Sequence, residues 1–69
     1  MTQENKVLVT LERFNTFSAW DQGYVSYMEA AWPGSEIPDT NPYQVGSPEY
    51  DEWKLGRWAA YMETLELDG

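Results

Sequence analysis

Cysteine and histidine are both absent from this chain. No disulfide can therefore hold the fold together, and neither a thiolate nucleophile nor an imidazole base is available for catalysis. Carboxylates remain, but the neighbours Asp51 and Glu52 do not face each other on a helix, so they do not form an acid–base pair. Glu49, Asp51 and Glu52 also lack the spacing of a calcium-binding loop. We therefore expect a protein that is not an enzyme and has no metal site and no cofactor.

Basic residues and long apolar runs are scarce. The chain has four Lys and Arg residues and 12 Asp and Glu residues, which gives a net charge of −8. This charge repels nucleic acid and anionic membranes and attracts basic protein surfaces, although acidity of this size also serves solubility alone. No apolar run approaches the roughly 20 residues of a membrane span. Since Met1 to Lys6 lack the apolar stretch of a signal peptide, we expect a soluble, cytoplasmic protein that binds no membrane and no nucleic acid directly.

Aromatic side chains are abundant: the 69 residues include four Trp, five Tyr and two Phe. Each large ring can bury roughly 150–250 Å², which compensates for the small size of the chain. We expect one domain over residues 1–69, and a monomer in preference to an oligomer.

Residues 16–32 predict the first helix. Asn15 or Thr16 can serve as its N-cap, and Pro33-Gly34 ends it. The apolar residues at helical spacing, which we expect to form the core face, are Phe17, Trp20, Tyr24, Tyr27, Met28 and Ala31. The other face carries Ser18, Gln22, Ser26 and Glu29.

Residues 48–65 predict the second helix, opened by Ser47 as N-cap and Pro48 in the first turn. Gly56 lies in its middle at a cost of about 1 kcal/mol relative to alanine, which close packing against the loop or a partner would justify. The apolar side comprises Tyr50, Leu55, Trp58, Tyr61, Met62 and Leu65, and the acidic side comprises Glu49, Glu52, Glu63 and Glu66.

The segment between the two helices, residues 33–47, predicts an ordered proline-rich loop anchored by Ile37, Tyr43 and Val45. We expect a mainly α fold in which the two amphipathic helices pack as an antiparallel hairpin. Residues 6–11 fit either a short N-terminal strand or the lead-in to a helix. We favour extended structure there, with residues 64–67 as the candidate partner strand.

The acidic side of the second helix is the main candidate binding surface. Glu52 and Glu63 are eleven residues apart, about 16 Å along a helix, and duplex DNA presents one phosphate about every 3.4 Å on each strand. A row of carboxylates can therefore resemble nucleic acid to a basic groove, and a solvated helix face remains the alternative. The candidate residues for partner binding are Glu49, Asp51, Glu52, Glu63 and Glu66, extended by Glu36 and Asp39 from the loop.

One tryptophan stands apart from the aromatic residues of the core. Trp53 falls off the apolar face of the second helix, between Glu52 and Lys54. It either caps the loop against the helix or stands exposed as an anchor for a partner, because Trp is enriched at interface hot spots. Trp58, by contrast, has core spacing.

A set of short motifs follows one order along the chain, over roughly residues 11–62: Gly23-Tyr24, Pro42-Tyr43-Gln44, Trp53, Leu55, Gly56 and Trp58-Ala59. This order of motifs resembles that of the ribosome modulation factor family. The resemblance implies two helices held together with their linker. Members of that family are basic and bind ribosomal RNA, whereas this chain has the opposite charge, so gripping RNA phosphates is not expected.

By size, acidity and lack of catalytic groups, the chain is similar to phage-encoded inhibitors of bacterial defence, including anti-CRISPR proteins that act as DNA mimics. Our leading hypothesis is such an inhibitor, bound to the basic DNA-binding surface of a host protein complex such as a CRISPR effector. The alternative is a ribosome- or translation-associated regulator of the ribosome modulation factor type. A third hypothesis is an adaptor that uses Trp53 and the loop as an apolar anchor.

Overall fold

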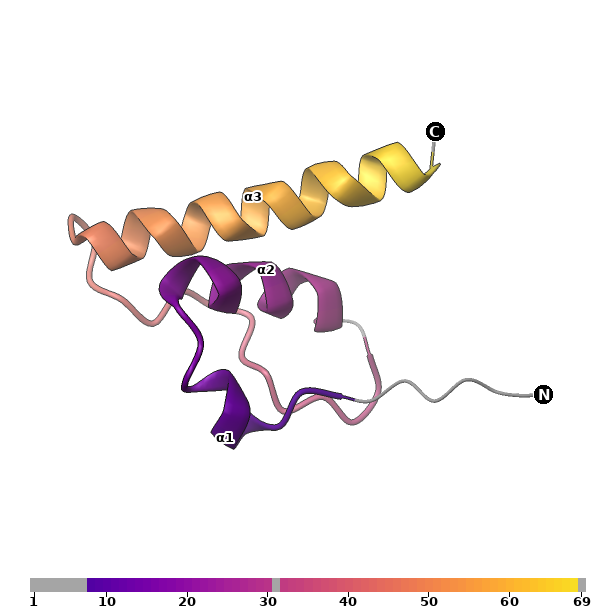
Figure 1. The fold of residues 1–69 in the computed structure, drawn as a ribbon, viewed down its shortest axis with the longest axis horizontal. Coiled ribbons are helices and arrows are strands. Elements are labelled where there is room, and N and C mark those ends of the chain that lie inside the picture. The colour runs from indigo at the N-terminus through magenta and orange to yellow at the C-terminus, as the bar shows by residue number, and fades with distance from the viewer. Residues whose placement is uncertain (1–7, 31, 69) are drawn as a thin grey trace.

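The computed structural model describes residues 8–30 and 32–68, and within them the fold is mainly α. Three helices follow one another along this part of the chain: α1 (Leu11–Phe14), α2 (Ala19–Glu29) and α3 (Pro48–Asp68). Figure 1 shows α2 in the middle, with the long α3 on one side and α1 on the other. The prediction of two helices that pack against each other and are joined by a proline-rich loop is confirmed.

Side-chain caps set where the helices begin. The hydroxyl of Ser47 accepts a hydrogen bond from the Tyr50 N–H at 3.1 Å, so α3 begins as predicted. The cap of α2 is Ser18, and the helix therefore starts later than predicted. Asn15 and Thr16 instead close α1, because their backbone N–H groups donate to carbonyl oxygens of that helix. α2 also stops earlier, and α3 runs further, than the sequence pattern indicated.

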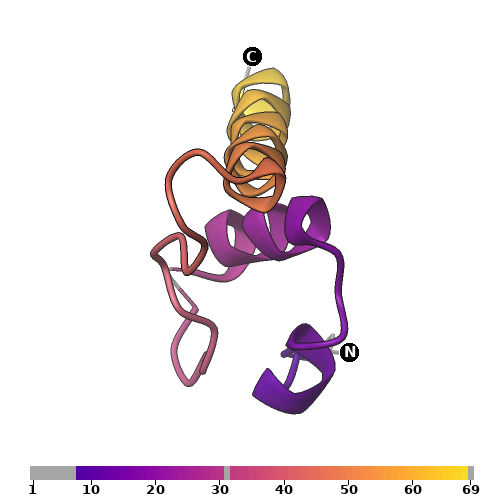
Figure 2. The same cartoon turned by 90° about the vertical axis from the view of Figure 1, so that its left-hand side faces the viewer.

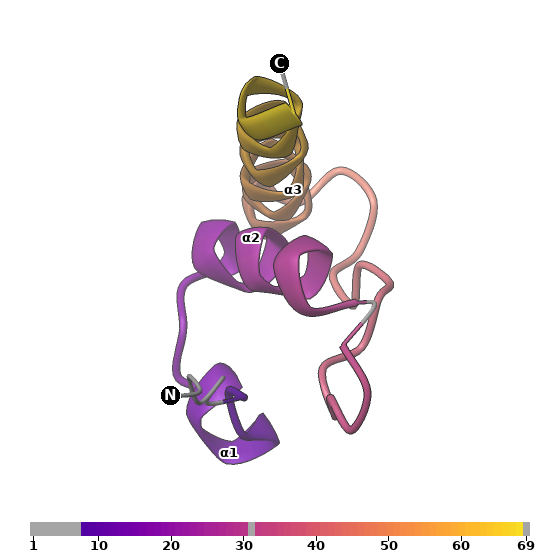
Figure 3. The ribbon, with the colours of Figure 1, turned by 90° about the vertical axis from the view of Figure 1, so that its right-hand side faces the viewer.

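The relative direction of α2 and α3 differs from the expectation. Both helices start at the same end of the molecule in Figure 1 and run the same way, and Figures 2 and 3 show α2 lying across α3. The antiparallel direction was therefore wrong. The physical reason is the loop over residues 32–47, which runs back along α2 before α3 begins (Figure 1). Its turns use Gly34 and Gly46, whose positive φ angles of 84° and 95° favour glycine.

The expected N-terminal strand is also wrong for the part of it that is described, because residues 8–10 have no strand partner and Leu11 begins α1. Lys6 and Val7 lie outside the described residues, and residues 64–67 belong to α3. The backbone N–H of Val9 instead donates a hydrogen bond to the buried carboxylate of Glu29, at 3.1 Å. A side-chain acceptor on α2 therefore takes the place of a second strand.

α2 and α3 meet backbone to backbone at two glycines. A Cβ atom on Gly23 would overlap the carbonyl oxygen of Trp53, and a Cβ atom on Gly56 would overlap the carbonyl oxygen of Trp20. No other residue type fits at either position without moving a helix. Gly56 is therefore explained by close packing against α2, rather than against the loop or a partner.

A row of polar side chains on α2, one turn apart, is buried: Gln22, Ser26 and Glu29. The helical spacing predicts these residues on the face opposite the core, and this prediction is wrong. They are buried because α2 is the middle layer of the fold, with α3 on one side and with α1 and the loop on the other (Figures 1 and 2). A buried polar group is stable when its hydrogen bonds are made inside the protein.

Each member of this polar row has such a partner. The Gln22 amide donates to the Phe14 carbonyl at 3.2 Å and accepts from the Tyr43 hydroxyl at 2.6 Å. The Ser26 hydroxyl accepts from the Arg57 guanidinium at 3.1 Å. Glu29 accepts from the Val9 N–H and the Ser35 hydroxyl. Among the described residues, no buried side-chain nitrogen or oxygen lacks a hydrogen bond.

The core is small, and the prediction that Trp58 belongs to it is wrong. Trp53 is only 5% exposed and belongs to the core, whereas Trp58 is 59% exposed. We call the close contact of α2 and α3 at Gly23 and Gly56 the glycine crossing. It turns the side of α3 with Trp53 toward α2. The apolar side of α3 that was predicted to form the core therefore faces outward. Among the loop anchors, Ile37 is buried as predicted, but Val45 is 75% exposed. The buried apolar residues are Phe14, Ala19, Ile37, Trp53 and Ala60.

The aromatic residues of α2 that were expected in the core lie along α3 but stay partly exposed. Tyr27 makes an edge contact with Tyr61 of α3, with ring centroids 6.0 Å apart. Trp20 stacks on Tyr24 at 5.5 Å and is 39% exposed. These rings therefore border the helix crossing rather than fill its centre.

Replacing Gly56 with alanine distinguishes the crossing from an ordinary helix position. In an ordinary helix, this change raises the free energy of unfolding by about 1 kcal/mol. At the crossing, the new methyl group overlaps the Trp20 carbonyl, so we expect a loss of about 1–3 kcal/mol. Urea denaturation followed by circular dichroism measures the change. A more stable G56A protein would contradict the crossing.

Alanine substitution of the two tryptophans tests which of them is core. Trp53→Ala should lower the free energy of unfolding by about 3–5 kcal/mol, as for a buried ring. Trp58→Ala should change it by about 0.5 kcal/mol, as for an exposed site. The same denaturation experiment compares the two variants directly. A larger loss for Trp58→Ala than for Trp53→Ala would reverse the assignment of the core.

Candidate functional site

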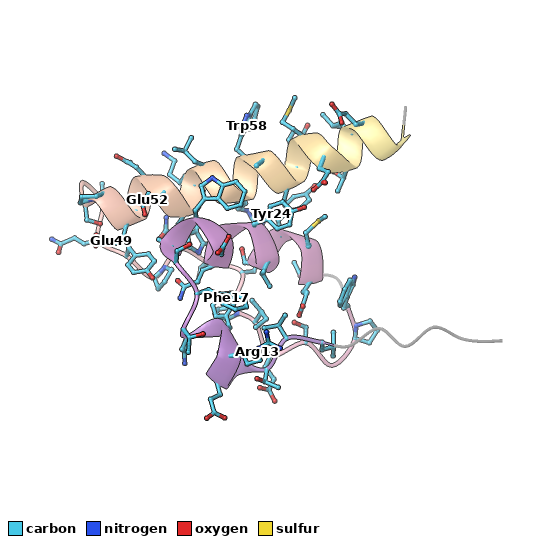
Figure 4. The ribbon with its side chains drawn as sticks, viewed as in Figure 1. Arg13, Phe17, Tyr24, Glu49, Glu52 and Trp58 are labelled. Atoms are coloured by element: carbon cyan, nitrogen blue, oxygen red, sulfur yellow. The ribbon has the colours of Figure 1, made fainter. Side chains whose placement is uncertain are left out.

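α3 presents an exposed apolar strip, which consists of Leu55, Trp58, Met62 and Leu65. At about 100° per residue, these side chains lie on the side of the helix opposite to the buried side with Trp53, Gly56 and Ala60. Figure 4 shows Trp58 projecting from α3 away from α2. Isolated exposed apolar residues are ordinary, but a contiguous patch marks an interaction surface.

Three of the predicted carboxylates form an acidic flank beside this strip: Glu52, Glu63 and Glu66. Helical geometry places them within about 60° of one another, between the buried side of α3 and the apolar strip. All three are exposed, and none forms a salt bridge with a described Lys or Arg. The structure thus brings together three of the five predicted carboxylates on α3.

The other two predicted carboxylates on α3, Glu49 and Asp51, are also exposed. Glu49 is in the first turn, where a negative charge is stabilised by the helix dipole, and Figure 4 shows it at the beginning of α3. Asp51 precedes Trp58 by two turns and therefore continues the apolar strip rather than the acidic flank.

The two loop carboxylates do not extend the acidic flank as proposed from the sequence. Asp39 forms a salt bridge with Arg57 at 2.6 Å, and Arg57 lies on the opposite flank of α3. Glu36 is exposed in the first half of the loop, which runs on the side of α2 away from α3 (Figure 1). The patch is therefore confined to α3.

Trp53 cannot serve as an exposed anchor, because it is almost fully buried. Its ring lies beside the Arg57 guanidinium, 5.5 Å from the ring centroid, and its carbonyl oxygen meets Gly23. The exposed alternative is therefore wrong, and the contacts of Trp53 are with α2 and Arg57.

The flank of α3 opposite to the acidic flank contains a shallow groove of about 270 Å³, which was not expected from the sequence. Its lining residues are Tyr27, Lys54, Arg57, Trp58 and Tyr61. Lys54 and Arg57 are two of the chain's four basic residues. Residues three apart are neighbours on a helix surface, so this spacing is the sequence feature that could have indicated a basic flank. α3 therefore carries opposite charges on its two flanks.

Arg57 has a structural role in this groove. Its guanidinium bonds Asp39 of the loop and Ser26 of α2, and it lies 5.3 Å from the ring centroid of Tyr27. Such cation–π and ion-pair contacts link the loop, α2 and α3. Lys54 lies over the Tyr50 ring at 5.3 Å and is exposed.

Tyr24 connects α2 to the acidic flank. Its hydroxyl donates a hydrogen bond to the carboxylate of Glu63. This hydrogen bond, together with burial and the negative charge of Glu63, raises the pKa of Tyr24 above its usual value. Figure 4 shows Tyr24 between the two helices. Glu63 is thus the one member of the flank whose orientation is fixed by the fold.

The described residues contain no cluster of three or more potential metal ligands. In the same part of the chain, no helix combines the length and the apolar character that crossing a membrane requires. No protein-family model matches the sequence, and searches of curated proteins and of solved structures find no match either.

Glu63→Gln should lower the pKa of Tyr24, because it removes the negative charge and weakens the acceptor of the hydrogen bond. An ultraviolet titration of the tyrosines should show one residue that ionises at lower pH in the variant than in the unmodified protein. Since the folded-state pKa is raised, the stabilisation from this bond is complete below the unfolded pKa of about 10 and declines as the pH rises above it. Glu66→Gln, on the same flank, is the control and should leave the titration unchanged.

Proposed function

We propose that this chain is a non-enzymatic inhibitor that binds the basic, nucleic-acid-binding surface of another protein through α3. The observation that carries the proposal is the acidic flank, which is exposed and has no salt bridge to a described Lys or Arg. A negative surface without internal compensation attracts basic partners and repels nucleic acid. The flank is also held on a regular helix, so its charges keep a fixed spacing.

The dimensions of the flank support mimicry of nucleic acid. From Glu52 to Glu66 the helix rises about 21 Å, a length over which one DNA strand presents about six phosphates. The protein offers fewer charges than DNA over that distance. Complementary charge would then chiefly accelerate association and make it sensitive to salt.

The target class follows from the resemblance in size, charge and lack of catalytic groups. We place the protein with phage-encoded inhibitors of bacterial defence, acting in the cytoplasm of the host cell on a DNA-binding complex such as a CRISPR effector. In this function the inhibitor needs no catalytic group, because it acts by covering the basic surface.

A second candidate is a ribosome- or translation-associated regulator. This candidate is favoured because the motif residues shared with the ribosome modulation factor family hold the fold together. Gly23 and Gly56 meet at the helix crossing, Trp53 is buried beside them, and Tyr43 bonds the buried Gln22. Co-sedimentation of the protein with ribosomes would support this function through protein contacts, and absence from all ribosomal fractions would refute it.

Glu52→Lys and Glu12→Lys form a matched pair that tests the leading proposal. Both change the net charge equally, but Glu52 lies on the acidic flank and Glu12 is exposed on α1. Each protein is immobilised as bait in a bacterial lysate. We expect the unmodified and Glu12→Lys proteins to retain a DNA-binding complex that added DNA or high salt releases, and Glu52→Lys to lose it. Equal capture by both variants would mean that general acidity, and not this flank, governs binding.

A further inference from the structure

We propose that α3 is a ligand helix, whose apolar strip docks into an apolar groove on a partner protein with basic residues along one rim. This inference rests on the proposed function for the charge of the partner and adds to it the mode of binding. The fold carries the helix, and the partner supplies the groove. Helix-in-groove recognition uses apolar anchors on one face of an amphipathic helix.

The spacing and exposure of the strip meet the requirements of such a ligand. Leu55, Trp58, Met62 and Leu65 follow one another at intervals of three, four and three residues, and all of them are exposed. This is the repeat that keeps side chains on one face of a helix. Trp58 is near the start of the strip and, at 59% exposed, offers the largest side chain for a pocket in a partner.

The length of α3 adds an independent argument. α3 has 21 residues and α2 has 11, so they are about 31 Å and 16 Å long. Figure 1 shows the C-terminal part of α3 continuing past the end of α2, with no other described element beside it. Short helical segments without tertiary contacts are only marginally stable in water. A partner groove would supply the missing contacts for the overhanging turns.

Charge decides between a different protein and a second copy of this chain. Two copies each carry a net charge of −8, and antiparallel strip-to-strip pairing would bring their acidic flanks toward each other, which is unfavourable. In parallel pairing each acidic flank would face Lys54 of the other copy, a single positive charge, because Arg57 is paired with Asp39. A groove with Lys or Arg along one rim would instead complement Glu52, Glu63 and Glu66. Lys54 lies on the other side of the strip, so an acidic or neutral second rim fits best. The two flanks together fix the orientation of α3 in the groove.

Site-specific photo-crosslinking tests this docking mode. A photoreactive phenylalanine analogue replaces Trp58 in one protein and Val45 in another. Val45 is also apolar and exposed, but lies in the loop. Circular dichroism checks that both proteins fold. Each is irradiated in a bacterial lysate, and the crosslinked peptides are identified by mass spectrometry. We expect position 58, and not position 45, to crosslink to an apolar groove that has Lys or Arg residues along one rim.

Several outcomes would overturn the inference. Crosslinks from position 58 to this chain itself or to a second copy would identify a different occupant of the strip. Equal labelling from positions 45 and 58 would indicate non-specific contact, and so would crosslinks to a surface without a groove. No crosslink from position 58, while DNA-sensitive capture persists, would leave the proposed function standing and refute the docking mode. Conversely, a groove crosslink to a partner that DNA does not displace would support the docking mode and refute mimicry.

A titration with the purified crosslinked protein adds a quantitative test. Trp58→Ala should weaken its affinity by about 30-fold, as expected for an anchor residue, and Val45→Ala should leave it unchanged. Raising the salt concentration should weaken both the unmodified and the Trp58→Ala proteins by a similar factor, because the apolar and charged contacts are separate. An unchanged affinity for Trp58→Ala would exclude Trp58 as the anchor and overturn the inference.

Discussion

The contact between two glycines and two carbonyl oxygens is the constraint on which the rest of this fold depends. Gly23 of α2 meets the Trp53 carbonyl, and Gly56 of α3 meets the Trp20 carbonyl. In both helices the tryptophan precedes the glycine by three residues, so each helix offers the other the same pair of features. Helix interfaces of this kind form weak Cα–H···O contacts, which require short distances between the backbones. The rotation of α3 about its own axis follows from this contact.

A second set of interactions is made by the buried polar row of α2, which consists of Gln22, Ser26 and Glu29. This row donates a hydrogen bond to α1 and accepts hydrogen bonds from the loop and from α3, which are far apart in the sequence. Hydrogen bonds to buried partners contribute modestly when they are made but leave a large penalty when one partner is missing. The polar row therefore specifies which segments may cover α2, and the glycine crossing specifies how α3 approaches it.

The sequence was sufficient to locate α2 and α3, because their apolar spacing and the Ser47 cap are local signals. It was not sufficient to orient them. The direction of α3 depends on the path of the loop, and its rotation depends on Gly56, for which periodicity assigns no partner. α3 has apolar side chains on two sides, and periodicity alone predicts that the wider side, with Trp58, faces the core. The carboxylates Glu52, Glu63 and Glu66 were grouped correctly, because spacing along one helix settles that question.

The errors in the candidate site have a similar origin. The pairing of Asp39 with Arg57 joins the loop to α3, and no local pattern indicates such a contact. The burial of Trp53 follows from the glycine crossing, which a helical wheel weighted by hydrophobicity does not detect. Local periodicity therefore predicts which residues share a face, whereas contacts between elements decide whether that face is covered.

The separation of two faces on α3 has a consequence for how this protein can change over time. The fold depends on the side with Trp53, Gly56 and Ala60, while the exposed strip and the acidic flank make few of the contacts that hold the helices together. Substitutions on the outward side therefore have little effect on stability, and selection for binding can act on them almost independently of selection for folding. A lineage of such proteins can follow a changing target by altering one side of a single helix, while the glycine crossing stays constant.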